Sequence, residues 1–257
     1  MSQREVDLSV IVPAYNEAER IGKTLTRLRN YLAQSGLSWE ILVVLDGSKD
    51  RTLEIAWQQA LQVPALKIIE RSVNRGKGFT VRQGMLQACG RIRLFTDADN
   101  STDIAHFEKM KPLFDQGFDV VIASRNSLDV DGAEQTVSQA WYKRAIGRLG
   151  NRIVQRLAVP GIWDTQCGFK AFRAEAALRI FSQTAIERWG FDIEVLALAR
   201  ALNFQIGMIP AQWVNDERSH VRLADYLGVL ADTFTVRRNF RAGKYDCKSA
   251  NPLGLRV

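Results

Sequence analysis

The first 132 residues alternate between short apolar runs and stretches in which apolar residues recur at helical spacing. Residues 8–14 (LSVIVPA) form one apolar run, and Ile21, Leu25, Leu28 and Leu32 follow at spacings of four, three and four. The run predicts a strand and the spacing predicts a helix. The pattern repeats, with strands predicted at 40–45, 66–70, 92–96 and 119–123 and helices around 51–61, 77–88 and 103–114. Such alternation predicts an α/β fold with a mostly parallel sheet and right-handed crossovers.

Beyond residue 132 two long helical patterns take over. From Val137 to Leu157 an apolar residue recurs every four positions beside a parallel stripe of arginines (Trp141, Ala145, Leu149, Ile153 and Leu157; Arg144, Arg148, Arg152 and Arg156). The second pattern, 222–241, places Leu223, Leu227, Leu230 and Phe234 on the side expected to face inward, with Arg237, Arg238 and Arg241 at its end. Such amphipathic helices are typical of a lipid headgroup layer, and also of a core-packed helix with a solvated basic face.

The basic charge lies in the second half of the chain. Residues 1–132 carry 17 basic and 17 acidic side chains, whereas residues 133–257 carry 18 and 11, for a formal net charge of +7. A cationic half can bind nucleic acid, anionic lipid headgroups or phosphorylated substrates. Because no RNA-binding aromatic motif, zinc finger or helix-turn-helix pattern accompanies the charge, we expect no nucleic acid partner.

The cysteines and apolar runs restrict the setting. Three widely spaced cysteines without a CxxC pair, and only two histidines, indicate neither a disulfide framework nor a zinc cluster. We therefore expect a reduced, cytoplasmic setting. The first residues lack the features of a secretion signal, and the apolar runs fall far short of the ~20 residues that a membrane helix needs.

Polar and acidic residues follow the predicted strands, where open sheets of this type bind ligands. Asp97 and Asp99 come directly after the strand at 92–96. Two carboxylates suit Mg²⁺ or Mn²⁺, which keep several waters and share phosphate oxygens, although acidic turn residues after a strand are also common. At 74–78, glycines allow close backbone approach and Lys77 can meet a phosphate. The segment is not a Walker loop, and no GxGxxG follows the first strand, so a dinucleotide-binding fold is disfavoured.

Seven motifs, in order over about residues 8–195, resemble the polyprenyl-phosphate (dolichyl-phosphate) branch of family 2 glycosyltransferases. They are VIVPAYNE, EILVVLDGSKDRT, NRGKG, TDADN, ASR, DTQCGFK and RWGFDIE. The last two are most similar to those of the dolichyl-phosphate β-glucosyltransferases. The resemblance implies a GT-A type nucleotide-sugar-binding fold. Because no Pro/Gly/Ser linker interrupts the chain, we expect one domain over 1–257, with a nucleotide-binding half (1–132) and an acceptor and membrane-interface half (133–257).

The resemblance also implies roles residue by residue. The substrate-binding positions are Pro13, Tyr15, Glu17, Asp46, Lys77, Asp97, Gln166, Lys170 and Trp189. The positions implied in catalysis are Asp99, Arg125, Asp164 and Asp192, with Asp97 and Asp99 also at the metal. Glu194 matches the motif beneath the transfer site. Where the family often has two aspartates, this chain has Leu45 and Asp46, which leaves one carboxylate to meet the base.

The implied activity is inverting transfer of a single sugar from a nucleotide sugar, most readily UDP-glucose, to polyprenyl or dolichyl phosphate. The cofactor is Mg²⁺ or Mn²⁺, and the enzyme is expected to lie peripherally on the cytoplasmic face of a membrane. A phosphate monoester has a second pKa near 6, is mostly dianionic at neutral pH and needs no general base. GDP-mannose or UDP-N-acetylglucosamine as donor and a saccharide hydroxyl as acceptor remain open.

Four acidic or thiol side chains, Asp164, Asp192, Glu194 and Cys167, have two interpretations each. Asp164 or Asp192 acts as a base if the acceptor is a hydroxyl, and otherwise only positions substrate. Asp192 and Glu194 can equally be structural, paired with Arg188 or a neighbouring arginine. Cys167 is better interpreted as a small buried residue than as a nucleophile, because inverting transfer needs no covalent intermediate and no histidine is near it in sequence.

Overall fold

The computed structural model describes residues 6–135, 150–213 and 223–247. Its strands are β1 (Leu8–Ala14), β2 (Trp39–Asp46), β3 (Leu66–Arg71), β4 (Ile92–Thr96), β5 (Val120–Ser124), β6 (Glu134–Gln135), β7 (Phe169–Arg173), β8 (Ile206–Pro210) and β9 (Gln212–Trp213). Its helices are α1 (Ile21–Gln34), α2 (Thr52–Ala60), α3 (Lys77–Gln87), the 3₁₀ helix η1 (Ile104–His106), α4 (Phe107–Asp115), α6 (Ala174–Phe181), α7 (Phe191–Ala201) and α8 (Leu223–Arg241). Residues 150–157 are also helical.

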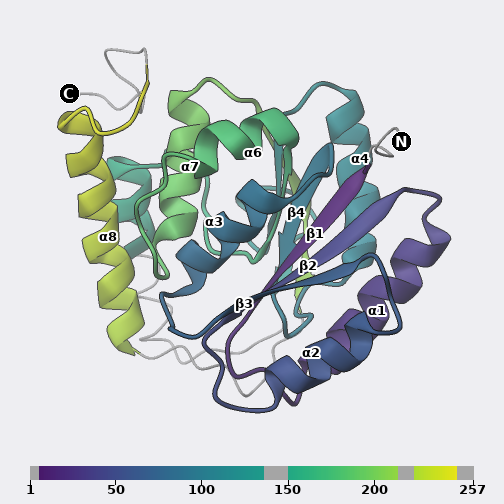
Figure 1. Cartoon of the computed structure of the whole chain (residues 1–257). Helices are drawn as coiled ribbons and strands as arrows, with labels where there is room; N and C mark the ends of the chain where they lie inside the picture. Colours follow the sequence, from purple (N-terminus) through teal and green to yellow (C-terminus); the bar gives the residue numbers. More distant parts are fainter. Residues whose placement is uncertain (1–5, 136–149, 214–222, 248–257) are drawn as a thin grey trace.

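One seven-stranded sheet forms the centre of the molecule, in the order β3-β2-β1-β4-β7-β5-β8 (Figure 1). β1 pairs in parallel with β2 and β4, β2 with β3, and β5 with β8. β7 runs antiparallel to both β4 and β5. The first residues of β7 therefore lie at the same sheet edge as the last residues of β4 and β5. Strands β6 and β9 form a separate short parallel pair.

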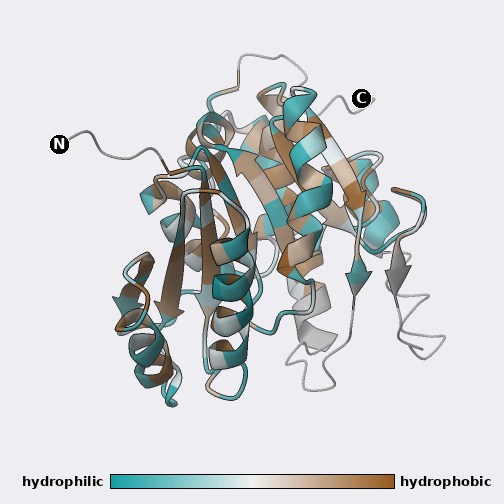
Figure 2. Cartoon of the chain, turned by 90° about the vertical axis from the view of Figure 1, so that its right-hand side faces the viewer, coloured by the Kyte–Doolittle hydropathy of each residue, from teal (hydrophilic) through white to brown (hydrophobic). Residues whose placement is uncertain are grey.

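Helices cover both faces of the sheet, which explains why the parallel strands are apolar nearly throughout. On β1, Val10 and Val12 belong to a core shared with α1, α2 and α4, whereas Ile11 belongs to a core shared with α3, α6, α7 and α8. Alternate strand residues point to opposite faces, so one strand serves both cores. Figure 2 shows these apolar strands lying between helices that carry hydrophilic residues.

The α/β fold and the strands and helices predicted in the first 132 residues are confirmed, with η1 and α4 replacing the single helix expected around 103–114. Beyond residue 132, where the sequence analysis named only helical patterns, β7 and β8 join the same sheet and were not predicted. β7 reads FKAFR, and its lysine, Lys170, is completely buried between β4 and β5. Because β7 is short and contains a lysine, its hydrophobic pattern does not predict a strand.

The helix expected at 222–241 is present as α8, but its expected inward side is wrong. Leu227 is 67% exposed and Phe234 57% exposed, whereas Thr233, Val236 and Asn239 are buried. Most of the other predicted basic helix, residues 136–149, lies outside the described part of the chain. In the remainder, Val154 is buried, and Arg152 and Arg156 are exposed. Among the described residues, no helix combines the length and apolar character that crossing a bilayer requires.

Candidate active site

The motifs that follow β1, β2, β3, β4 and β5 lie at the sheet edge beyond the carboxyl ends of these strands, where mixed α/β sheets bind ligands. Antiparallel β7 brings the residues before it, 164–168, to the same edge, because its register pairs Phe169 with Thr96 at the end of β4. Segments distant in sequence are therefore gathered at one rim.

The segment that follows β1 is hydrogen-bonded to the segment that follows β2. The N–H of Glu17 donates to Thr52 Oγ1 at 2.7 Å, and the N–H of Ala18 donates to Asp50 Oδ2 at 3.1 Å. Pro13 is buried within β1, and Tyr15 beyond it is 42% exposed. Burial raises the pKa of Glu17, the Arg20 guanidinium opposes this, and the charges of Asp99 and Asp97 add to the rise. Glu17 thus faces the same acidic site as these two aspartates.

Asp46 anchors the NRGKG loop. Its buried carboxylate accepts hydrogen bonds from Arg71 Nη2 at 2.6 Å, from the Arg75 N–H at 2.8 Å and from the Gly76 N–H at 2.7 Å. Asp46 therefore fixes the loop that carries Lys77, whatever contact it makes with a base.

The two glycines of this loop are needed by the chain itself. A Cβ on Gly76 would lie 2.5 Å from the carbonyl oxygen of Glu187, and one on Gly78 would lie 2.6 Å from that of Ile186. Gly76 also has a φ of 107°, which side chains rarely adopt. The sequence suggested close approach to a ligand, and the structure adds close approach to the backbone of residues 186–187.

Lys77 and Asp97 form an ion pair at the centre of the rim. Lys77 Nζ lies 2.6 Å from Asp97 Oδ1 and 5.4 Å from the centre of the Trp189 ring. Burial lowers the pKa of Lys77, but the charges of Asp97, Asp192 and Asp99 raise it more, so the ammonium stays charged. A Cβ on Gly168 would lie 2.0 Å from Asp97 Oδ2, so the Asp97 carboxylate occupies space that only a glycine at this position leaves open.

Asp99 stands two residues further on, with a different partner. Its Oδ1 accepts a hydrogen bond from the Ser101 N–H at 2.9 Å. In the described part of the chain, no three His, Cys, Asp or Glu side chains are grouped so as to hold a metal ion. The metal-binding role implied for Asp97 and Asp99 stays a prediction; as carboxylates they are ligands of the kind that Mg²⁺ or Mn²⁺ takes together with water and phosphate oxygens.

Arg125 is locked by Asp164. Arg125 Nε donates to Asp164 Oδ2 at 2.7 Å, its Nη2 to Oδ1 at 2.8 Å, and its own N–H to Oδ2 at 2.8 Å. Burial disfavours the guanidinium charge, yet the Asp164 carboxylate outweighs it and raises the pKa of Arg125, helped by Asp97. Asp129 in turn accepts from the Trp163 and Asp164 N–H groups at 2.6 and 2.8 Å, which positions Asp164.

Lys170 and Asp192 form a second ion pair beneath the rim. Lys170 Nζ donates to Asp192 Oδ1 at 2.6 Å and to the Cys167 carbonyl at 2.5 Å. Lys170 is 0% exposed and Asp192 2% exposed, and the substrate-binding role implied for Lys170 stays a prediction. Burial raises the pKa of Asp192, and Lys170 and Lys77 oppose that rise. Cys167 is buried, and burial raises the pKa of its thiol to about 11, as expected of a structural residue.

Gln166 is the other residue of this segment implied in substrate binding. Among the described residues, its Nε2 is buried and has no hydrogen-bond partner. Glu194, in contrast, is fully buried. Its carboxylate accepts hydrogen bonds from the N–H groups of Ala185 and Ile186 and from Tyr245 Oη. Among the described residues, the hydrogen bonds of Asp192 come from Lys170 and those of Glu194 from the groups just named, and not from Arg188.

A family model described as glycosyl transferase family 2 matches residues 9–181. The chain belongs to glycosyltransferase family 2. Dolichyl-phosphate beta-glucosyltransferases from Trichomonas vaginalis, Homo sapiens and Saccharomyces cerevisiae are each 34% identical to it. These alignments cover 96%, 93% and 94% of this chain and 75%, 77% and 77% of the relatives. The resemblance drawn from the motifs is confirmed, and the chain is a family 2 hexosyltransferase.

Solved structures with the GT-A fold are similar to this chain. Glucosyl-3-phosphoglycerate synthase from Mycobacterium tuberculosis, in complex with Mn²⁺, UDP and its product, aligns with a TM-score of 0.61 at 17% identity over 93% of this chain and 80% of that one. A mannosyltransferase from Pyrobaculum calidifontis, in complex with GDP-Man and Mn²⁺, aligns with a TM-score of 0.60 at 18% identity over 97% and 67%. At these identities the likeness establishes the fold.

Three residues of this family 2 glycosyltransferase that shape the site were missed in the sequence. Arg71 holds Asp46, Asp129 positions Asp164, and Gly168 seats Asp97. Gly168 lies within the DTQCGFK motif and could have been found there. Arg71 and Asp129 carried no signal, since only the folded chain brings them to their partners.

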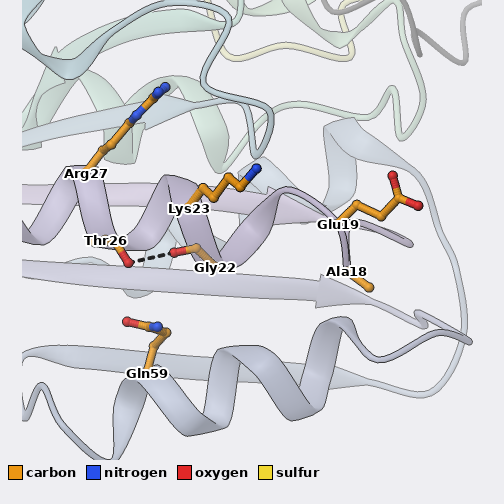
Figure 3. Close-up of a pocket in the computed structure, with 7 residues that line it drawn as sticks. All are labelled: Ala18, Glu19, Gly22, Lys23, Thr26, Arg27 and Gln59. Atoms are coloured by element: carbon orange, nitrogen blue, oxygen red, sulfur yellow. Dashed lines mark hydrogen bonds between the residues drawn. The ribbon is translucent and has the colours of Figure 1, made fainter.

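A hollow of about 510 Å³ lies between α1 and α2 and reaches the segment after β1 (Figure 3). It is lined by Ala18, Glu19, Gly22, Lys23, Thr26, Arg27 and Gln59. None of the residues implied in substrate binding lines it.

Proposed function

We propose that this family 2 glycosyltransferase transfers glucose with inversion from UDP-glucose to polyprenyl or dolichyl phosphate. The relatives, 34% identical over more than nine-tenths of this chain, are dolichyl-phosphate beta-glucosyltransferases. One structural observation carries the proposal. Two cations, Lys77 and Arg125, lie close enough to Asp97 for its negative charge to raise the pKa of both. Donor diphosphate and acceptor phosphate are both anions, and a site that joins them needs cations at both ends.

On the donor side, Lys77 and the two aspartates would bind the diphosphate. A divalent ion held by Asp97 and Asp99 would neutralise the charge that develops on the departing nucleoside diphosphate. Lys77, already charged and placed at the rim, would add a second positive charge to the same group. Asp46 would keep the loop rigid, so that little reorganisation is needed when the donor binds.

On the acceptor side, Arg125 would hold the lipid phosphate in line with the sugar. Asp164 fixes the guanidinium through paired hydrogen bonds, a geometry that favours a single orientation. The phosphate can attack without a general base, because it is already an anion at neutral pH. Asp192 is buried and bonded to Lys170, which suits a supporting role better than proton abstraction from a hydroxyl.

The membrane would be met by α8. Leu227 and Phe234 are exposed on this helix, Ala231 is exposed between them, and Arg238 and Arg241 are exposed near its end. An exposed apolar stripe followed by arginines suits a helix that lies in the headgroup layer. We accordingly propose a peripheral position on the cytoplasmic face of a membrane, where lipid phosphate would be presented to Arg125.

A donor and acceptor panel tests the proposal. Purified chain would be incubated with UDP-glucose, UDP-N-acetylglucosamine or GDP-mannose, with polyprenyl phosphate or a saccharide as acceptor, and with Mg²⁺, Mn²⁺ or EDTA. We expect a lipid-extractable glucose phosphate that mild acid cleaves, formed only with UDP-glucose, polyprenyl phosphate and a divalent ion. Preferential transfer from GDP-mannose, or to a saccharide hydroxyl, would overturn the assignment in favour of those alternatives.

A further inference from the structure

Residues 185–190 lie between α8 and the NRGKG loop and contact both. At their first end, the Glu194 carboxylate accepts hydrogen bonds from the N–H groups of Ala185 and Ile186 at 3.0 and 2.9 Å. The same carboxylate accepts one from Tyr245 Oη at 2.5 Å, which ties in the chain that follows α8. Glu194 is completely buried and Tyr245 is 6% exposed, so this end is fixed.

The other end of the segment is held by α8 itself. The N–H of Gly190 donates to Asp232 Oδ2 at 3.2 Å. A Cβ on Gly190 would lie 2.3 Å from the Cβ of Asp232, so only glycine permits this approach. The segment is thus held at one end by Glu194 of α7, which also bonds Tyr245 beyond α8, and at the other end by Asp232 of α8.

Between these ends the segment packs on the donor loop. The carbonyl of Glu187 accepts a hydrogen bond from the Phe79 N–H at 3.1 Å, and the Glu187 carboxylate pairs with Arg75. The same carbonyl lies so close to Gly76, directly before Lys77, that a Cβ on Gly76 would overlap with it. Trp189, inside the segment, lies against the Lys77 ammonium. Lys77 is therefore contacted by the segment through its backbone neighbours and its side chain.

We propose that Asp232 of α8 is a positioning residue for Lys77, and that it acts through residues 185–190. This inference rests on the donor-binding role proposed for Lys77. Without the hydrogen bond to Gly190, the segment loses its α8 attachment, the Glu187 carbonyl is no longer held over Phe79, and Lys77 samples positions away from Asp97. The helix with the exposed apolar stripe would then be mechanically joined to the diphosphate-binding loop.

Three variants test the attachment: Asp232→Ala, Asp232→Asn and Asp115→Ala. Asn keeps an oxygen that can accept from Gly190 but removes the charge that also acts on Arg188, and Asp115→Ala removes an exposed carboxylate on α4 as a matched control. Hydrogen exchange of the Phe79 amide would be measured without ligand, and the Kd for UDP with Mn²⁺ by calorimetry. We expect Asp232→Ala to speed Phe79 exchange and to raise the Kd about five-fold, the effect of one lost hydrogen bond.

The Asn variant and the control should stay within about two-fold of wild type in both measurements. Unchanged Phe79 exchange in Asp232→Ala, with faster exchange confined to α8, would overturn the inference. Tyr245→Phe supplies a second test at the other end, since it removes only the hydroxyl bonded to Glu194, and it should also speed Phe79 exchange. If wild type fails to bind UDP with Mn²⁺, the proposed function fails, while the exchange comparison still decides on the attachment.

Discussion

Asp97 and Asp99 lie two residues apart after β4, yet their surroundings assign them different tasks. Asp97 is paired with Lys77, whereas Asp99 is held by the Ser101 N–H. A metal ion would rely on Asp99 the more, because Asp97 is already partly neutralised. We expect Asp99→Ala to lower turnover with Mg²⁺ or Mn²⁺ by about 100-fold or more, as for other groups that stabilise developing charge.

Asp103→Ala is the matched control for this variant. Asp103 is an exposed carboxylate four residues on, and it caps η1 by accepting from the Ala105 N–H. Turnover by Asp103→Ala should stay near wild type in the same radiolabelled transfer assay. Wild-type turnover by Asp99→Ala would refute the metal role of this aspartate.

Gly168 offers a second test at the scale of single residues. An alanine there would press its Cβ on the Asp97 carboxylate, which is partly exposed and can move aside. We therefore expect Gly168→Ala to leave the Tm nearly unchanged but to raise the Kd for UDP with Mn²⁺ about ten-fold, a typical cost of overpacking. Gly228→Ala, where an added Cβ would meet nothing within 4 Å, should bind as wild type does. A large fall in Tm without weaker binding would contradict this account.

At the scale of elements, the sequence predicted what burial on two faces produces. β1, β2, β4 and β5 are mainly apolar because helices cover both sides of the sheet, and this signal needs no tertiary information. The same logic failed for β7, where Lys170 is buried by a partner, Asp192, that lies 22 residues away in sequence. It also failed for the orientation of α8, because Thr233 and Asn239 are buried there as polar residues.

The candidate site shows the same division. The motifs located the rim residues, since strand ends are local features. Their support was not predictable, because Asp46 is held by Arg71 across neighbouring strands and Asp164 by Asp129 across 35 residues. The buried Asn239 of α8 likewise has its partner outside the helix, because its Nδ2 donates to the Tyr245 hydroxyl at 3.1 Å.

The amino end of β2 carries a testable buried charge. Glu40 accepts hydrogen bonds from Ser9 Oγ, Lys67 Nζ and the Cys89 N–H at 2.6, 2.7 and 2.7 Å. Burial tends to raise the pKa of Glu40, but these donors together lower it. Because a lowered pKa stabilises the folded state above the unfolded pKa, we expect Glu40→Gln to reduce the free energy of unfolding at pH 7 by about 1–3 kcal/mol.

Urea unfolding of both proteins between pH 7 and pH 3 checks this prediction. The difference in free energy should persist down to about pH 4.3, the ordinary pKa of glutamate, and shrink as the pH falls through the lower pKa of the folded protein. A difference that is constant across this range would show that Glu40 stabilises the fold through packing and not through its charge. Glu54→Gln, at an exposed ion pair on α2, should change stability little at any pH.

At the scale of the whole molecule, α8 lies at the left of Figure 1 and α2 at the bottom, right of centre. Both carry exposed apolar residues, Leu227 and Phe234 on α8 and Trp57 with Leu61 at α2. What distinguishes α8 is the pair of exposed arginines at its end, Arg238 and Arg241, and its attachment to the segment over Lys77. If α8 lies in the headgroup layer, charges placed on its apolar stripe must be expelled from lipid, whereas charges at α2 remain in water.

We therefore expect the double variant Leu227→Glu, Phe234→Glu to lower binding to vesicles that contain anionic lipid by about ten-fold or more, since two partly buried apolar side chains are lost. The matched double variant Trp57→Glu, Leu61→Glu removes equally exposed apolar side chains and adds the same charge elsewhere, and it should bind as wild type does. Co-sedimentation at fixed salt measures both. Equal losses in the two variants would mean that net charge alone sets the affinity, and α8 would lose its place as the membrane-facing element.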